Sequence, residues 1–245
     1  MSHQAFDSYF NSMFRQANTF SDKEYDSMGL SFKINHGRYL PKNRDAAILD
    51  LGCGAGHFLH FLRSEGYTNV SGVDVSPQQV DFCREKGFKN VTHADGREYL
   101  NSHPETFDAV IANDIVEHLP KSDVIEFLKS AYSSLKPSGL LVLKTPNMGN
   151  PAALYSRYFD FTHETGYTEK SIYQILFLAG FTEISVHPVV PSARTLRRMI
   201  ERFIQKVLLT MIRKSIQYQG AVAPSILTIN LLALAVKSSD PSAAE

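Results

Sequence analysis

The sequence predicts an α/β domain with a mostly parallel sheet, and three observations indicate it. Short apolar runs alternate with helix-like patterns from residue 46 onward, which is the order of consecutive βαβ units. A glycine-rich loop follows the first run directly, and the successive runs end in acidic or amide side chains. The length of 245 residues suits one decorated domain better than two independent ones.

Each predicted strand is bounded by recognisable turn or helix signals. Ser76 and Pro77, after the second strand, form an N-cap and N1 pair. Gly66 stands where the first helix is expected to stop, and a Lys-Pro-Ser-Gly turn precedes the fifth strand. The predicted strands are 46–51, 70–75, 91–95, 107–113 and 140–145, and the predicted helices are 56–65, 77–86 and 121–135.

Composition excludes several classes of protein. The formal net charge is zero, so nothing global favours a nucleic-acid partner, and none is expected. Two cysteines, Cys53 and Cys83, are too few for a disulfide framework and suggest a reducing compartment. No secretory leader is visible, and the longest apolar runs are shorter than the ~20 residues that span a bilayer. We therefore expect a cytoplasmic protein.

The loop after the first strand carries a specific glycine spacing. Gly52, Gly54 and Gly56 form G-x-G-x-G, whereas the dinucleotide fingerprint is G-x-G-x-x-G. Asp50 precedes the first glycine by two positions. A carboxylate at this place would oppose a diphosphate but suits a ligand with an ammonium or sulfonium group. The alternative is a glycine turn without a ligand.

Polar side chains end the next three strands. Asp74 lies about twenty residues beyond the glycine loop, where an acid commonly binds ribose hydroxyls. Asp95 with Gly96, and Asn113, end the third and fourth strands. The carboxyl ends of neighbouring parallel strands meet at one edge, where such sheets bind ligands. The pattern predicts one binding site formed by these residues.

These stretches resemble the motifs of the class I S-adenosylmethionine-dependent methyltransferases. The similarity lies in LDLGCGAGHF, GVDVS, HADGREYL, FDAVIANDIVEHL and LKPSGLLVLKTPN, and it covers roughly 46–147. It implies a Rossmann-like, seven-stranded, mostly parallel sheet with helices on both faces and an antiparallel last strand. Segments 182–190 and 225–236 would be the sixth and seventh strands. The implied cofactor is S-adenosyl-L-methionine.

The resemblance also assigns cofactor contacts position by position. The methionine part of the cofactor would contact Gly52, Gly54, Gly56 and Asn113, and Asp50 would bind its amino group through water. Asp74 would bind the ribose hydroxyls. The adenine would contact Val75, Asp95 and Gly96.

Methyl transfer to oxygen needs a base, because the acceptor hydroxyl must lose its proton. His163 is the first candidate, since its segment could cover the methyl group, and Asp160 could orient its imidazole. His118 is the second candidate. The alternatives are that His163 packs or caps its loop and that His118 acts in positioning. The six other histidines singled out are expected to be surface or structural residues (His36, His57, His60, His93, His103 and His187), and no metal-ligand spacing is seen.

The D-x-x-H stretch at 160–163 is similar to that of methyltransferases associated with bacterial surface-polysaccharide biosynthesis. It implies O-methylation of a sugar hydroxyl on a glycan or on a lipid- or nucleotide-linked saccharide. One alternative is a small-molecule O- or N-methyltransferase, with quinone-like lipids among its substrates. Another is a non-catalytic protein that binds S-adenosylmethionine and acts through a partner.

A basic amphipathic segment lies between the last two predicted strands. Residues 192–219 contain seven Lys or Arg and one acid, so the segment carries +6 and the rest of the chain −6. The favoured interpretation is a helix that packs its apolar stripe on the domain or on another subunit as an oligomer. The alternative is a peripheral helix in an anionic membrane interface at the inner face.

The expected organisation follows from these segments. It is an N-terminal helical cap at 1–40, a core at 41–190 with a substrate loop at 146–168, a basic helical insertion at 191–220, a final core strand within 221–236 and a flexible tail at 237–245.

Overall fold

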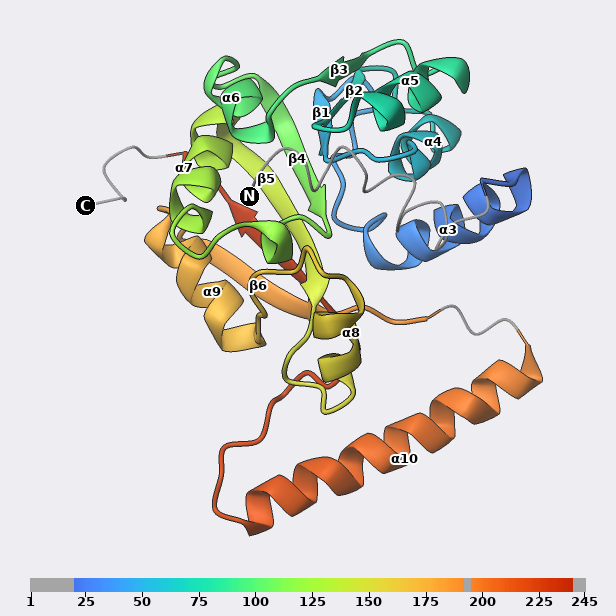
Figure 1. Ribbon diagram of the computed structural model, residues 1–245, viewed down its shortest axis with the longest axis vertical. Coiled ribbons are helices and arrows are strands. Elements are labelled where there is room, and N and C mark those ends of the chain that lie inside the picture. The colour runs from blue at the N-terminus through green and yellow to red at the C-terminus, as the bar shows by residue number, and fades with distance from the viewer. Residues whose placement is uncertain (1–19, 192–194, 240–245) are drawn as a thin grey trace.

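The computed structural model, which describes residues 20–191 and 195–239, contains a seven-stranded sheet in the order β3-β2-β1-β4-β5-β7-β6 (Figure 1). The pairs among β1 to β5 are parallel, and β7 is antiparallel to both of its neighbours, β5 and β6. The predicted fold class is therefore confirmed, including the insertion of the last strand beside the sixth. The strands are β1 (Ile48–Leu51), β2 (Val70–Asp74), β3 (Val91–His93), β4 (Phe107–Asn113), β5 (Leu135–Pro146), β6 (Glu183–Pro188) and β7 (Asn230–Val236).

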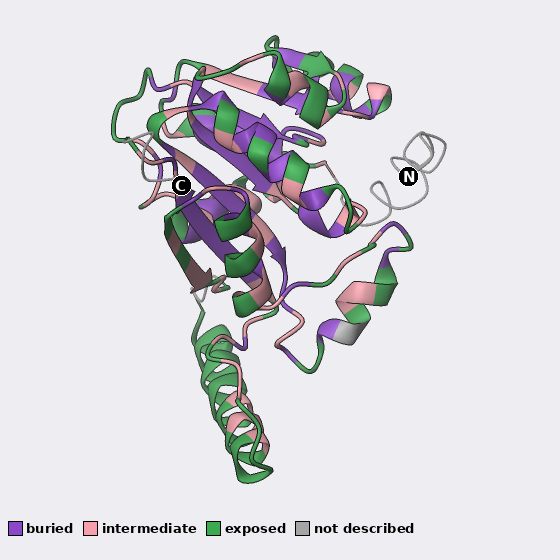
Figure 2. Ribbon diagram, turned by 90° about the vertical axis from the view of Figure 1, so that its left-hand side faces the viewer, coloured by how far each residue is buried: buried purple, intermediate pink, exposed green. Residues whose placement is uncertain are grey.

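Helices cover both faces of the sheet because neighbouring strand residues point to opposite sides. Ile48 and Ile111 pack in one cluster with Phe58, whereas Leu49 and Val110 pack in the other. Figure 2 shows the buried strands between the two helical layers. One layer has α3 (Asp22–Asn35), α4 (His57–Ser64) and α5 (Pro77–Glu85), and the other has α6 (Gly96–Asn101), α7 (Val124–Ser134) and α9 (Glu169–Leu178).

The predicted N-terminal cap, 1–40, is described only from residue 20, so its part at 1–19 lies outside the described residues. In the described part of the cap, α3 packs on α4, and the Tyr25 hydroxyl donates to the Ala55 carbonyl of the glycine loop at 2.7 Å. The Asn35 side chain pairs with the backbone of Val190 in both directions, at 2.8 and 3.1 Å. Helix α3 is thereby fixed beside the glycine loop.

The final strand is shorter than the sequence suggested. Within the predicted 225–236, β7 begins only at Asn230. The preceding residues are irregular, because their carbonyls accept hydrogen bonds from side chains instead of a strand. Asn147 donates to Ile226 and Thr228, and Asn150 donates to Leu227, all within 3.0 Å.

The tail also starts later than predicted. Lys237 is buried, and its ammonium donates to the Leu135 carbonyl at 2.8 Å and to Glu105 at 3.2 Å. Residues 240–245 lie outside the described range.

Two helices lie in segments whose structure was predicted only in part. The predicted substrate loop contains α8 (Ala153–Phe159), whose last residue borders the cavity described below. The basic segment forms α10 (Leu196–Tyr218), which projects from the body and has no buried residue (Figure 1). The expectation that its stripe packs on the domain is wrong. In the part of the chain that is described, no helix is long and apolar enough to cross a membrane.

The start of α4 provides a stability test. Gly56 has φ +80°, and a Cβ there would lie 3.0 Å from both Cys83 Sγ and the Phe88 ring. Gly87 has φ +85° with nothing near its Cβ position. We expect Gly87→Ala to cost about 1–2 kcal/mol for the left-handed backbone, and Gly56→Ala to cost about 1–3 kcal/mol more through overpacking. Chemical denaturation of both variants measures the difference, and equal losses would show that the packing around Gly56 relaxes without cost.

Candidate active site

A cavity of about 590 Å³ opens at the carboxyl ends of the central strands. This volume is in the usual range for small-molecule sites. Most of the side chains and glycines predicted from widely separated motifs meet there. Ten of the twelve predicted site residues line it, namely Gly52, Gly54, Asp74, Val75, Asp95, Gly96, Asn113, His118, Asp160 and His163.

Asp74 shapes the glycine loop from the end of β2. Its buried carboxylate accepts from the Gly54 N–H and from the Ser76 N–H, both at 2.9 Å. Gly52 and Gly54 both have positive φ, at 67° and 54°, so the loop turns tightly and its backbone borders the cavity. Burial raises the pKa of Asp74, while these two amide donors lower it.

Asp50 and Gly56, also predicted as cofactor residues, are not among the described residues that line the cavity. Gly56 is the N-cap of α4. Asp50 is buried within β1, and burial and the nearby Asp74 carboxylate raise its pKa well above the ordinary range. Its role at the amino group of a cofactor stays a prediction.

The other end of the cavity has an apolar wall and one acid. Asp95 caps α6 by accepting from the Arg97 and Glu98 N–H groups through one oxygen. Val75, Ala94 and Phe127 are among the nearby lining residues. Apolar side chains together with a carboxylate in the cavity lining suit a purine ring with an exocyclic amine.

Asn113 has a partner that the sequence did not reveal. His36, expected to be structural or exposed, is buried, and its Nε2 lies 3.0 Å from Asn113 Oδ1. Because Oδ1 can only accept, Nε2 carries the proton. Asn113 lines the cavity, and its Nδ2 is buried without a hydrogen-bond partner among the described residues. The two residues are 77 positions apart, and no local motif joins them.

The burial of His36 gives a pH test. Desolvation lowers its pKa from 6.5 to about 4, although the bond to Asn113 opposes the shift. A depressed histidine pKa contributes stability above the unfolded value, near 6.5, and that contribution is lost as the pH falls toward 4. We expect wild type to lose roughly 3 kcal/mol more than His36→Gln between pH 7 and pH 4. Urea unfolding at a series of pH values measures this, and parallel curves would contradict it.

His118 is oriented through a hydroxyl relay. Its Nδ1 lies 2.9 Å from Thr162 Oγ1, and that hydroxyl donates to Asp160 Oδ1 at 2.6 Å. The threonine hydroxyl therefore accepts from Nδ1–H, which leaves Nε2 of His118 as the basic nitrogen. Burial, together with nearby His163, lowers the pKa of His118. Asp160, expected to orient His163, acts here on His118 through Thr162.

His163 is held by a carbonyl. Its Nδ1 lies 2.8 Å from the Ser156 carbonyl oxygen, which can only accept, so Nδ1 is protonated and Nε2 keeps its lone pair. The Arg157 guanidinium donates to the carbonyls of His163 and Glu164 and so fixes the segment. The rings of His118 and His163 meet edge to face at 4.7 Å between centroids. Two basic nitrogens thus belong to rings that border the cavity.

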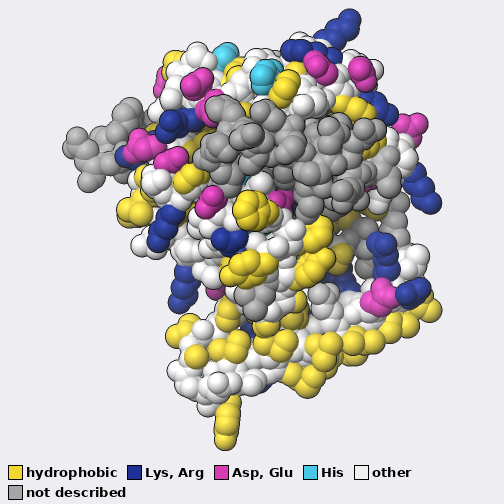
Figure 3. All heavy atoms as spheres, in the orientation of Figure 1, with side chains coloured by type: hydrophobic (Ala, Val, Ile, Leu, Met, Phe, Trp, Pro, Cys, Tyr) yellow, Lys and Arg dark blue, Asp and Glu magenta, His cyan; other side chains and the backbone are white. Residues whose placement is uncertain are grey.

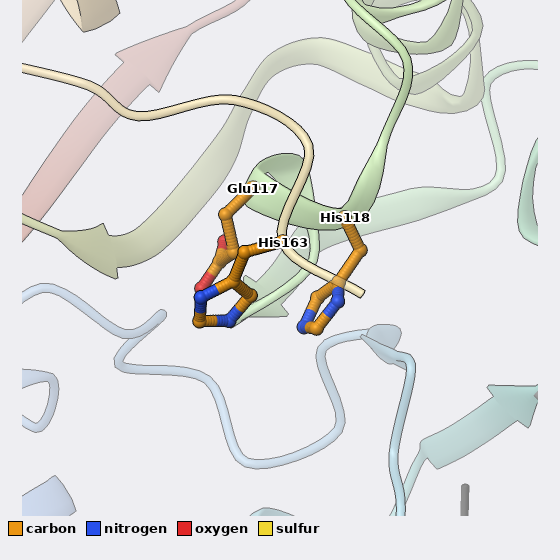
Figure 4. Close-up of side chains that lie close together, drawn as sticks. All are labelled: Glu117, His118 and His163. Atoms are coloured by element: carbon orange, nitrogen blue, oxygen red, sulfur yellow. The ribbon is translucent and has the colours of Figure 1, made fainter. Parts of the chain in front are cut away.

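Glu117 completes a cluster with these histidines (Figure 4). It is buried, and one oxygen accepts from Thr145 Oγ1 at 3.0 Å while Oε1 has no hydrogen-bond partner among the described residues. Burial raises its pKa well above the ordinary range. Ligand atoms of Glu117, His118 and His163 all lie within 4.8 Å of one another, a set that could hold a divalent cation. The sequence showed no such spacing, because His163 comes from a distant loop.

Comparison with known proteins decides the family. A family model described as Methyltransferase domain matches residues 31–186. The chain belongs to this methyltransferase family. The ubiquinone biosynthesis O-methyltransferase of Methylocella silvestris is 32% identical over 130 residues, which covers 50% of this chain and 50% of that protein. The enzyme of the same name from Xanthomonas campestris is 32% identical over 113 residues, covering 44% and 46%. The chain thus spans about half the length of these relatives.

Solved structures agree with this methyltransferase fold. A SAM-dependent methyltransferase from Archaeoglobus fulgidus has a TM-score of 0.67 and 25% identity, and the match covers 94% of this chain and 100% of that one. Phosphoethanolamine N-methyltransferase 2 of Haemonchus contortus, solved with S-adenosyl-L-methionine, has a TM-score of 0.62 and 20% identity, covering 95% and 60%. The fold is that of the SAM-dependent methyltransferases, and S-adenosylmethionine is the cofactor of this fold.

The residues of this methyltransferase domain fit that cofactor. The glycine backbone lets a ligand approach closely. Asn113, whose Nδ2 has no partner among the described residues, and the Asp74 carboxylate bring a donor and an acceptor to one cavity. The apolar side chains of Val75 and Phe127 in the cavity lining suit the purine. Glycines in place of a phosphate-binding fingerprint, with acids around them, fit a cationic sulfonium nucleoside better than a diphosphate.

Proposed function

We propose that the protein methylates a hydroxyl oxygen with S-adenosylmethionine as donor and His163 as general base. The main support is the hydrogen bond that His163 Nδ1 donates to the Ser156 carbonyl. Because Nδ1 holds the proton of the neutral ring, the lone pair that can accept a proton lies on Nε2. When bound, S-adenosylmethionine supplies a methyl group already activated on a sulfonium. The chain then has to align the acceptor, exclude water and take the hydroxyl proton at His163 Nε2.

The acceptor we favour is a quinone-like lipid or a similar small hydroxylated molecule. The cavity wall near the two histidines includes Leu119, Pro120, Pro146 and Phe159, an apolar surface suited to such a ring. Arg157 uses its guanidinium on two carbonyls, which argues against its use for an anionic sugar. The relatives named ubiquinone biosynthesis O-methyltransferase support the same class.

A sugar hydroxyl on a glycan or on a lipid- or nucleotide-linked saccharide is the second candidate. Tyr155 and Tyr158 of α8 are 72% and 75% exposed, close in sequence to the lining residue Phe159. Exposed aromatic rings of this kind suit stacking on a sugar face. The same two rings also suit contact with a lipid acceptor.

A labelling screen tests the proposal. Purified protein and radioactive methyl donor are incubated with lipid, polysaccharide and soluble fractions of cells, with His163→Ala as the matched blank. Label in the lipid fraction that stays with the lipid after mild acid hydrolysis supports the quinone-like acceptor. Label in the polysaccharide or nucleotide-sugar fraction, or label that mild acid releases from a lipid as a sugar, supports the sugar. Cofactor binding without label in any fraction would contradict an enzymatic role and favour a non-catalytic binding protein.

A further inference from the structure

Helix α10 presents a long apolar surface to solvent. On a wheel of about 100° per residue, seven apolar side chains fall on one arc. All seven are exposed, between 42% and 73%. Figure 3 shows apolar side chains along this helix. The stripe consists of Leu196, Met199, Ile200, Phe203, Ile204, Val207 and Met211.

Among the described residues, the chain covers the side of the helix opposite the stripe, in its C-terminal half. Four side chains of α10 are half-buried, and on the same wheel their mean direction is about 180° from the stripe. The return segment after α10 contributes to this side, since Arg213 donates to the Ser225 carbonyl at 2.5 Å. That segment is itself fixed by Glu169, which accepts from the N–H groups of Ser225 and Ile226. The half-buried residues are Leu209, Ile212, Arg213 and Ile216.

Charge identifies the kind of surface that suits this helix. Within 196–218 there are six cations and one acid, and that acid, Glu201, pairs with Arg197 at 2.8 Å. Arg202 and Lys206 lie one turn apart beside the stripe, on its polar flank. Five of the six cations lie outside the arc of the stripe, and Lys214 falls within that arc just beyond Met211. An apolar stripe about 23 Å long with cations beside it and at its end is the pattern of helices that lie in anionic membrane interfaces.

The same charge argues against a second copy of the chain. Two α10 helices packed stripe to stripe would bring together two surfaces of the same strongly positive sign, which opposes association. An anionic lipid surface instead gains about 1 kcal/mol for each Lys or Arg near it. We propose that α10 lies in the interface of an anionic membrane, with its apolar stripe among the acyl chains and its cations at the headgroups.

Vesicle flotation of the full chain tests this. Wild type is expected to float with vesicles containing about 30% phosphatidylglycerol and to bind weakly to phosphatidylcholine alone or at about 0.5 M salt. Arg202→Glu with Lys206→Glu is expected to weaken partitioning at least about 30-fold. Lys23→Glu with Lys89→Glu makes the same change in net charge at exposed positions outside α10 and is expected to float nearly as well as wild type.

A second pair of changes tests the stripe. Phe203→Ser with Val207→Ser removes apolar area at exposed positions, so the protein is expected to keep its melting temperature and lose flotation. The proposal is overturned if wild type does not float with anionic vesicles, or if the α10 charge pair floats like its control. It is also overturned if light scattering shows a dimer that the stripe variant separates, because a second copy would then cover the stripe. These readouts do not depend on methyl transfer.

Discussion

Replacing His163 by alanine is expected to lower kcat by about 10²- to 10⁴-fold, which is the usual contribution of a general base. The ring lines the cavity, and its Nδ1 is engaged by the Ser156 carbonyl, so the variant removes the nitrogen that would accept the hydroxyl proton. Affinity for S-adenosylhomocysteine is expected to change little, because the predicted cofactor contacts lie on other residues. Steady-state kinetics with the identified acceptor, together with calorimetry, separate the two effects.

Two further variants distinguish base catalysis from a structural role. His163→Gln keeps a side-chain donor for the Ser156 carbonyl but has no basic nitrogen, so it is expected to stay as slow as the alanine variant. His103→Ala is a control at a half-buried histidine that is not among the cavity-lining residues and is expected to keep full turnover. Full activity of the glutamine variant would show that His163 only positions its loop. Full activity of His163→Ala would favour a nitrogen acceptor, which needs no strong base.

Replacing Asp74 by alanine is expected to weaken cofactor binding about 100-fold or more. The change removes the acceptor for the Gly54 and Ser76 amides, so the glycine loop loses its anchor, and it removes the acid proposed to bind the ribose. Each hydrogen bond to a charged group contributes about 1.5–3 kcal/mol, and part of the loss falls on stability instead of binding. Calorimetric titration with S-adenosylhomocysteine gives the affinity.

Asp108 provides the matched control for Asp74. It also accepts from a backbone amide, that of Ala47 at 2.7 Å, and pairs with Lys136. Unlike Asp74, it is not among the described residues that line the cavity. Asp108→Ala is expected to lower stability without changing cofactor affinity. If the two aspartate variants bind the cofactor equally well, Asp74 does not hold the ribose or the loop.

The sequence was informative where periodicity and turn chemistry act locally. The alternation of strands and helices predicted a parallel sheet. Because the carboxyl ends of parallel strands meet at one edge, Gly52, Asp74, Asp95 and Asn113 could be predicted to lie together, and all four line the cavity. The short helix α6 was missed, although Asp95 is an N-cap residue, because the same acid was interpreted only as a ligand contact.

Contacts between distant segments could not be predicted in this way. The bond from His36 to Asn113 and the Thr162 link between His118 and Asp160 depend on how loops pack, and no spacing encodes them. The sequence pattern predicted the apolar stripe of α10 correctly. It did not predict that the stripe is exposed, because amphipathicity shows that one face is apolar and not what packs against it. The Glu117 cluster likewise needed the fold to bring His163 close.

Isothermal calorimetry shows whether the cavity at the ends of β1, β2 and β4 binds a sulfonium nucleoside. We predict that S-adenosylmethionine and S-adenosylhomocysteine each bind at one site per chain and that Asp74→Ala weakens both. No binding of either compound, or binding of a nicotinamide dinucleotide in the same cavity, would contradict the account.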